Sequence, residues 1–300
     1  MTLRRRVVGS GALAVLAVCG AFARGAQDDT TRSITPEKFL AARPGATSKT
    51  PPGTYRVAQP RSPATPVPAG AQTVELGVTI WRLRAAKPTD VARLLVQDAD
   101  SATQWTPERV PVGAPLAAGD RVRLSVESPR AGYLYVVDRE QYADGKNGEP
   151  FLIFPTTRTH GGANAVTGGR LMEIPSQDDR PPFFTLRPSR PDQTGERLTI
   201  VITAQPLKDV TIGAAPLQLA RSVVDDWEAR GAAAVERLEM IGGAGRAWSQ
   251  AEQRAGADAT RLLKQDDPPP QTLFRVVVRQ PDLVAVNVVL THPRTGGKSR

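Results

Sequence analysis

Two histidines, His160 and His292, are the residues from which acid–base or metal chemistry would start in this chain. A serine hydrolase needs a histidine that a carboxylate holds and that faces a nucleophile. His160 lies in the glycine-rich stretch 159–164, His292 ends the last predicted strand, and no nucleophile-elbow motif occurs in the sequence. Two isolated histidines also make no recognisable zinc ligand set. The sequence therefore predicts two solvent-exposed histidines, no catalytic residue and no metal site.

Glycine-rich stretches raise the question of phosphate binding. Residues 242–248 contain the glycines, but they lack a preceding strand and the Gly-Lys-Ser/Thr ending of a phosphate-binding loop. The pattern favours a connection between two helices, and we expect no cofactor.

Aromatic and basic side chains in polar segments are the candidate contact residues. Trp105, close to Arg109, and Tyr142 lie in segments without a clear strand pattern, where an exposed ring would suit a carbohydrate or a peptide. Burial of Trp105 against a helical pair is the alternative interpretation.

Alternation of loops between the two ends of a sandwich predicts how the charges gather. If every strand crosses the sheet fully, one end collects Arg130, Arg158, His160 and Arg190, and could bind an anion. The other end collects carboxylates, which could hold calcium or simply form solvated turns; they are Asp138, Asp144, Asp178 and Asp179.

The first 23 residues predict export. Arg4, Arg5 and Arg6 precede the apolar run Val7 to Cys19, and Ala21-Phe-Ala23 suits a signal peptidase that cuts after Ala23. We therefore expect the protein in the periplasm or outside the cell. Two alternatives remain open at this point: a lipid anchor on Cys19, and an uncleaved membrane anchor, although the run is short for a spanning helix.

Cleavage would also change composition and charge. It removes the only cysteine, so the mature chain would have no disulfide and no thiolate ligand. Loss of the three arginines lowers the formal charge from +9 to +6. That excess favours anionic envelope polymers or lipid head groups as partners. The sequence contains no lysine-rich run and no aromatic-plus-basic groove motif, so we do not expect nucleic acid as a partner.

Proline content separates an N-terminal arm from the folded part of the chain. Residues 24–72 are rich in proline and poor in large apolar residues, which predicts a disordered arm with a short helix over 34–42. Residues 73–292 form the single predicted domain, and 293–300 a flexible tail. Short strands are expected at 74–84, 121–127, 133–138, 151–155, 170–174, 183–187 and 197–204.

A helical section interrupts these strands. Residues 90–97 predict one early helix, and 207–265 contain a helical pair. The first of the pair is capped by Ser222 and ends at Gly242-Gly243, with an apolar stripe of Val223, Trp227, Ala234, Val235 and Leu238. The second begins with a capping box, Ser249 and Glu252. Strands over 273–279 and 283–292 close the domain as a hairpin. The expected fold is mainly β: an antiparallel β-sandwich, immunoglobulin-like or related, with the helical pair before the C-terminal hairpin.

Several of these segments, in this order, resemble a known bacterial family. The chain is similar to the domain of unknown function family 4384 over roughly residues 76–207. The matching segments are 119–127, 132–138, 152–155, 171–175 and the strand that ends in Gln205-Pro-Leu207. The resemblance implies an accessory or recognition module, often exported, and it supplies no catalytic residues.

Together these observations favour an exported, non-enzymatic binding or accessory module of the cell envelope. Its partner would be a protein or an anionic envelope polymer. Two alternatives remain: an envelope hydrolase whose site escapes motif recognition, and a structural subunit of an envelope assembly. A deep pocket with a titratable group beside a nucleophile would indicate the hydrolase, and a shallow surface or an open sheet edge would indicate the binding module.

Overall fold

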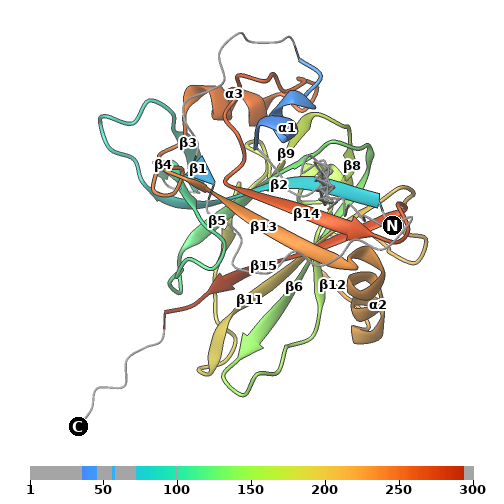
Figure 1. Cartoon of the computed structure of the whole chain (residues 1–300). Helices are drawn as coiled ribbons and strands as arrows, with labels where there is room; N and C mark the ends of the chain where they lie inside the picture. The colour runs from blue at the N-terminus through green and yellow to red at the C-terminus, as the bar shows by residue number, and fades with distance from the viewer. Residues whose placement is uncertain (1–35, 46–55, 58–71, 99–100, 294–300) are drawn as a thin grey trace, which may run out of the picture. The chain divides into compact units, whose positions relative to one another are not determined.

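Two antiparallel β-sheets packed face to face form the body of the structure (Figure 1). The structure, a computed structural model, describes residues 36–45, 56–57, 72–98 and 101–293. The predicted signal peptide, most of the predicted arm and residues 294–300 of the predicted tail lie outside the described residues. The mainly β, sandwich-type fold expected from the sequence is confirmed.

The first sheet has nine strands. Its main path runs β1-β13-β14-β2-β4-β3, and β5 pairs with β2 on one side and with β9 and β10 on the other. The strands are β1 (Arg56–Val57), β2 (Gln72–Ala85), β3 (Leu94–Asp98), β4 (Ser101–Val110), β5 (Arg121–Ser128), β9 (Arg170–Ile174), β10 (Phe184–Thr185), β13 (Ala234–Ile241) and β14 (Thr272–Val278).

The second sheet has six strands, in the order β12-β7-β6-β11-β15, with β8 beside β6. They are β6 (Gly132–Tyr142), β7 (Phe151–Phe154), β8 (Ala165–Val166), β11 (Gln193–Thr203), β12 (Leu217–Gln218) and β15 (Leu283–Thr291). The predicted final hairpin is therefore split between the sheets, because β14 pairs with β2 and β13 whereas β15 pairs with β11.

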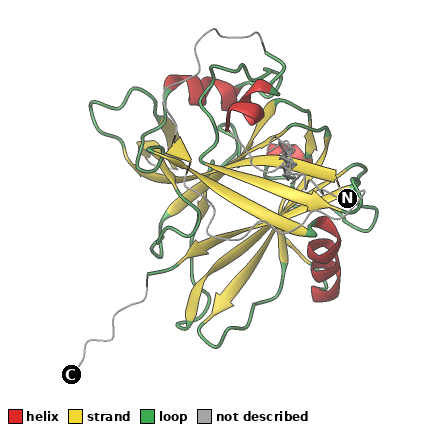
Figure 2. Ribbon diagram, viewed as in Figure 1, coloured by secondary structure: helices red, strands yellow, loops and turns green. Residues whose placement is uncertain are grey.

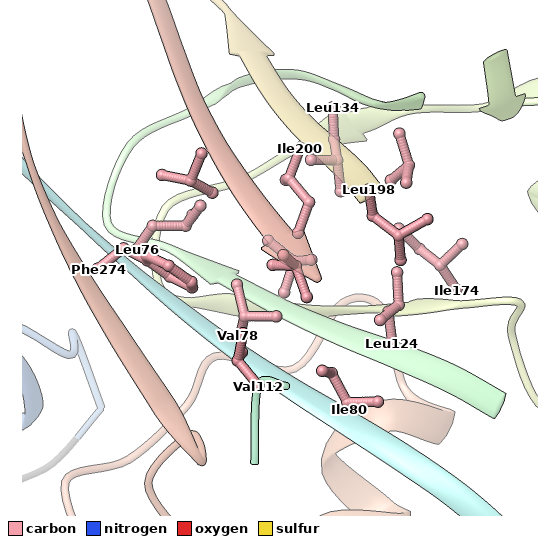
Figure 3. Close-up of a cluster of buried hydrophobic side chains, with 14 of the residues drawn as sticks. Leu76, Val78, Ile80, Val112, Leu124, Leu134, Ile174, Leu198, Ile200 and Phe274 are labelled. Atoms are coloured by element: carbon pink, nitrogen blue, oxygen red, sulfur yellow. The ribbon is translucent and has the colours of Figure 1, made fainter. Parts of the chain in front are cut away.

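Alternate residues of both sheets fill the space between them (Figure 3). On β5, Val122, Leu124 and Val126 share the inner face, as their spacing predicts, and each is buried. Ile200 of β11 and Phe274 of β14 meet them from other strands. Because side chains alternate across a strand, this core leaves the intervening polar residues of β5 on the outer face of the first sheet.

Helices lie on the outer faces of the sheets (Figure 2). They are α1 (Pro36–Ala41), α2 (Arg221–Gly231) and α3 (Gln250–Ala257); the short 3₁₀ helix η2 (His160–Gly162) lies instead against Phe154 of the core and Glu173 of β9. Val224 and Trp227 of α2 pack with Tyr135, Val137 and Leu283 of the second sheet. No helix in the described part of the chain is long and apolar enough to cross a membrane.

The helix predicted over 90–97 is wrong. The segment contains β3, in which Leu94 and Val96 are buried while Leu95 between them is 56% exposed. This period-two burial is that of a strand, and pairing with β4 provides the hydrogen bonds that a helix would have supplied internally.

The helix predicted to run from Ser222 to residue 241 is wrong in its second half. The observed helix α2 has Ala220 as its N-cap, without a side-chain bond, and it ends at Gly231. A Cβ on Gly231 would lie 2.5 Å from the Cβ of Ala285, so the helix crosses β15 closely there. Beyond it, Leu238 and Met240 of β13 are both buried against α1, a strand spacing. The expected capping box of α3 is confirmed.

The segment around Trp105, predicted to be irregular, is strand β4. Ala86 N donates to Gln104 O, so the even-numbered residues of β4 direct their backbone groups toward β2. The nitrogen of Pro107 therefore points to the edge of β4 that faces away from β2. β3 pairs with β4 only as far as Trp105; beyond it the same edge bonds to residues 246–248, where Arg109 N donates to Arg246 O and Pro107 O accepts from Trp248 N.

Three buried arginine–glutamate pairs lie on the outer face of the first sheet; two of them attach covering segments, and the pair of Arg123 and Glu173 joins β5 to β9 beneath the cover. Arg43 pairs with Glu127 at 2.7 Å, Arg123 pairs with Glu173 at 2.8 Å, and Arg109 of β4 pairs with Glu252 of α3. Arg43 follows α1, which lies within the short helix predicted over 34–42, and residues 36–45 of the predicted disordered arm pack on the sheet. In that segment, Phe39, Leu40 and Arg43 are buried.

Candidate functional site

Trp105 and Arg109 lie on the same face of β4 but do not act together. Arg109 is 6% exposed, bonds to the carboxylate of Glu252 and donates to Pro269 O at 2.7 Å. Its guanidinium also lies 5.3 Å from the centre of the Trp81 ring. The expectation of a surface pair of Trp105 and Arg109 is therefore wrong, because Arg109 is part of the buried attachment of α3.

Trp105 instead stacks on Arg121, a residue that the sequence did not single out. The Arg121 guanidinium lies 4.3 Å from the centre of the Trp105 ring and 4.5 Å from that of Phe183. Trp105 comes from β4, Arg121 begins β5, and Phe183 precedes β10, so three segments hold this group (the Trp105–Arg121–Phe183 stack). Cation–π contacts of this kind contribute about 0.5–1 kcal/mol each at exposed sites.

Arg121 differs from the other arginines of this face because it has no carboxylate. Within the described residues its guanidinium donates no hydrogen bond, and its nitrogens are not among the buried unpartnered atoms. Residue 121 is half-buried. Both ring centres lie within 4.5 Å of the guanidinium carbon, and no described residue accepts from its N–H groups, the donors that bind a carboxylate or phosphate in bidentate fashion.

Tyr142 and Arg190 come together, contrary to the predicted grouping of charges at two ends. The Arg190 guanidinium lies 4.0 Å from the centre of the Tyr142 ring and bonds to Asp192 at 2.9 and 2.7 Å. The Tyr142 hydroxyl donates to Glu140 at 2.5 Å, and this bond, with burial and the charge of Glu140, raises the pKa of Tyr142. Arg190 thus already has an acidic partner.

His160 belongs with the loop predicted to lie at the opposite end. Its backbone N–H donates to Asp179 at 2.9 Å, and its ring Nε2 bonds to the carbonyl oxygen of Glu173 on β9. The predicted alternation of loops between the two ends of the sandwich is wrong here. The chain between β7 and β9 includes only the two-residue strand β8 and does not recross the sheet. Arg158 is exposed in the same loop, and no hydrogen bond joins it to another described residue.

The geometry of a serine hydrolase is absent from the described residues. His292 is 7% exposed, so it is not the solvent-exposed histidine expected, and its Nδ1 bonds to Leu116 O at 3.0 Å. Neither histidine ring contacts a serine or threonine hydroxyl in the described part of the chain. The void beside Trp81 and Trp248 measures about 20 Å³, which is room for one water and not for a substrate.

The carboxylates considered for calcium do not converge. Asp179 accepts from the backbone of Ser176, Asp144 accepts from the backbone of Lys146, and Asp138 on β6 is half-buried with its Oδ1 atom inaccessible to solvent. Among residues 36–45, 56–57, 72–98 and 101–293, no three His, Cys, Asp or Glu side chains could hold a metal ion together. The Trp105–Arg121–Phe183 stack is therefore the best candidate site.

The sequence offered a signal for Arg121, but an ambiguous one. Arg121, Arg123, Ser125 and Glu127 alternate with the core residues of β5, a pattern that suggests a solvated face. The structure covers the last three and pairs Arg123 with Glu173 and Glu127 with Arg43, whereas Arg121 has no acidic partner among the described residues. Comparison of the chain with models of known protein families, with curated proteins and with solved structures finds no match in any of the three.

Proposed function

We propose that this protein is an exported, non-enzymatic binding module of the bacterial cell envelope. It holds an anionic envelope polymer through the Trp105–Arg121–Phe183 stack. The observation that carries the proposal is an arginine held against two rings with no carboxylate partner in the described part of the chain. The resemblance of residues 76–207 to the domain of unknown function family 4384 supports an accessory or recognition role.

The stack suits an anion for two physical reasons. A guanidinium offers parallel N–H donors that match the oxygens of a carboxylate or phosphate, and such charge-assisted bonds are stronger than neutral ones. An arginine already held in place also loses little side-chain entropy when the ligand binds, so more of the interaction energy appears as affinity. The net charge, +9 for the full chain and +6 after the expected cleavage, favours the approach of the same ligands.

Titration with an acidic oligosaccharide, such as a tetrauronate, tests the proposal, with binding measured by calorimetry and by backbone chemical shifts. Arg121→Gln should weaken binding by about tenfold or more, because a bond to a charged group is worth about 1.5–3 kcal/mol. Arg121→Lys keeps the charge but loses the flat stack, and it should weaken binding severalfold.

Arg158→Gln is the matched control, because Arg158 is an exposed arginine outside the stack. It removes the same charge and should change the affinity by less than about twofold. Equal losses in the two glutamine variants would show that binding is only non-specific attraction to a basic protein. Shifts confined to residues far from Trp105, or no shifts at all, would also reject the site.

An open sheet edge favours a second candidate, a protein partner that adds a strand. Met240 N donates to Gln271 O at 2.8 Å, so by alternation Val235 and Arg237 direct their backbone groups away from β14. Among the described residues only β1 pairs with that edge, at Met240 and Ile241. A photo-crosslinker at Val235 in intact cells should capture the partner, whereas one at exposed Val91 should not. Arg237→Pro should abolish capture.

A further inference from the structure

Four titratable side chains meet at one end of the second sheet. On β6, β11 and β15, alternate residues Val136, Leu198 and Leu290 belong to the core between the sheets. By the same alternation the inner face continues with Asp138 and Glu140 on β6, Glu196 on β11 and His292 after β15. The register places them side by side, since Glu196 lies opposite both Glu140 and Leu290, and Asp138 lies opposite Leu198. We call Asp138, Glu140, Glu196 and His292 the carboxyl–histidine cluster.

Two polar atoms of this cluster are buried without a partner. Asp138 Oδ1 and His292 Nε2 are inaccessible to solvent and form no hydrogen bond with a described residue. The nearest charged atom to His292 Nε2 is Glu196 Oε1 at 3.9 Å, and the two side chains are only 6% and 12% exposed. A buried polar atom left unpaired costs about 1–3 kcal/mol, so the cluster is costly unless a proton changes its charges.

No arginine or lysine contacts the cluster among the described residues. Arg139 and Arg197, on the same strands, lie on the opposite face and bond to Glu228 of α2. Arg190, from the adjacent loop, pairs with Asp192. Glu140 at the outer rim accepts the hydroxyl protons of Tyr142 at 2.5 Å and Ser189 at 2.6 Å.

The loop that packs over the cluster brings no cation either. The carboxylate of Asp120 in this loop accepts from Ala117 N at 2.8 Å. Three carboxyls and one histidine therefore share this place, and protons are the available counter-charge within the described part of the chain.

Electrostatics point in the same direction. Burial raises the pKa of Asp138 well above its ordinary value, and the neighbouring charges of Glu196 and Glu140 raise it further. Burial also raises the pKa of Glu196, where His292 acts in the opposite sense and Glu140 adds to the rise. The folded protein therefore binds a proton here more tightly than the unfolded chain does.

The cluster sits on a junction between the sheets. His292 N donates to Thr194 O at 2.8 Å, and His292 Nδ1 bonds to Leu116 O at 3.0 Å, in the loop between β4 and β5. Leu116 N in turn donates to Thr291 O at 2.8 Å. These bonds tie the end of β15 to the first sheet. Repulsion between the ionised carboxylates of Asp138 and Glu196 would therefore weaken these hydrogen bonds directly.

We propose that Asp138, Glu196 and His292 form a proton-binding site that closes this junction when protonated and loosens it as the pH rises. Deprotonation leaves two negative charges in a buried space, and opening the junction lets water reach them. The transition stays local, because α2 and the outer face of the first sheet are held by separate arginine pairs.

Hydrogen exchange of the full chain tests this proposal, with protection factors of the Leu116 and His292 amides measured between pH 5.5 and 8.5. In the natural protein we expect protection to fall by about tenfold or more as the pH rises, since one pKa unit corresponds to a factor of ten. Asp138→Asn keeps the shape without the charge, so protection should stay level over this range.

Asp144→Asn is the matched control, since Asp144 is an exposed carboxylate of the loop that follows β6. It should retain the fall seen in the natural protein. An identical fall in Asp138→Asn, or protection that rises with pH in the natural protein, would overturn the proposal. If Asp138→Asn does not fold, Glu196→Gln replaces it with the same expectation. The ¹³C signal of the Asp138 carboxyl, read directly, should titrate at higher pH than that of Asp144.

Discussion

Two regions of this molecule bury charge in opposite ways. On the outer face of the first sheet, each buried carboxylate has a guanidinium beside it: Arg43 with Glu127, Arg109 with Glu252, and Arg123 with Glu173. Each of these arginines also donates to a backbone carbonyl. At the end of the second sheet, the carboxyl–histidine cluster has no guanidinium among the described residues.

The difference shows what each arrangement can do. Arginine stays charged at all ordinary pH values, so the first arrangement is a permanent attachment of the cover formed by residues 36–45 and α3. Carboxyls and a histidine change charge with pH, so the second arrangement depends on solution conditions. Arg121 is a third case, a fixed cation without a fixed anion. Four substitutions test this comparison.

The largest effect is expected when one partner of a buried pair is removed. Arg123→Ala leaves Glu173 buried without its guanidinium, with only the Gln177 amide still bonded to its carboxylate, and both side chains of the pair are only 2% exposed, so the free energy of unfolding should fall by about 3–5 kcal/mol. Guanidinium chloride denaturation measures the change. Arg190→Ala removes an exposed pair with Asp192 and should cost at most about 1 kcal/mol. Similar losses of unfolding free energy in both variants would contradict the distinction between buried and exposed ion pairs.

The second prediction concerns pH. The pKa of Asp138 is raised in the folded state, so its contribution to stability is full below the unfolded pKa of about 3.9 and is lost as the pH rises through the folded pKa. Asp138→Asn cannot lose that contribution. Its stability relative to the natural protein should therefore increase from pH 4 to pH 8, by about 1.4 kcal/mol per unit of raised pKa. Urea titrations at several pH values measure this, and a constant difference would contradict it.

The third prediction concerns the contact between α3 and Glu173. A Cβ on Gly256 would lie 2.0 Å from Glu173 Oε1, inside a buried ion pair that cannot easily move. Helix propensity alone would make Gly256→Ala stabilising by about 1 kcal/mol. We expect the steric conflict to prevail, with a net loss of about 1–3 kcal/mol in thermal or chemical unfolding. Gly213→Ala, where a Cβ meets nothing within 4 Å, should be nearly neutral.

The sequence predicted the parts of this fold that rest on local patterns. Alternation located β5 and β9, and Ser249 with Glu252 marked the start of α3. Prediction from the sequence failed where one residue pattern is compatible with both a helix and a strand. Val235 and Leu238 suit a helical stripe, but pairing with β14 and burial under α1 make the segment a strand.

The candidate sites were harder to predict because they join distant segments. The polar residues of β5 resemble a solvated face until α3 and Arg43 return to cover it. Glu196 and His292 become neighbours only through the β11–β15 ladder. Trp105 was singled out from the sequence, but its contact with Arg121 depends on the registers of β4 and β5 against β2. Nothing in the local sequence specifies these registers.

The smallest effect on stability is expected at Arg121, and its size decides how the residue should be understood. Arg121→Lys gives up stacking on Trp105 and Phe183 but breaks no ion pair with a described residue, so the free energy of unfolding should fall by about 1 kcal/mol or less. A loss as large as that in Arg123→Ala would place Arg121 among the permanent attachments, and the proposed ligand would lose its support. A small loss of stability, together with a clear loss of affinity for the acidic oligosaccharide, would show that the rings hold this arginine for a partner outside the chain.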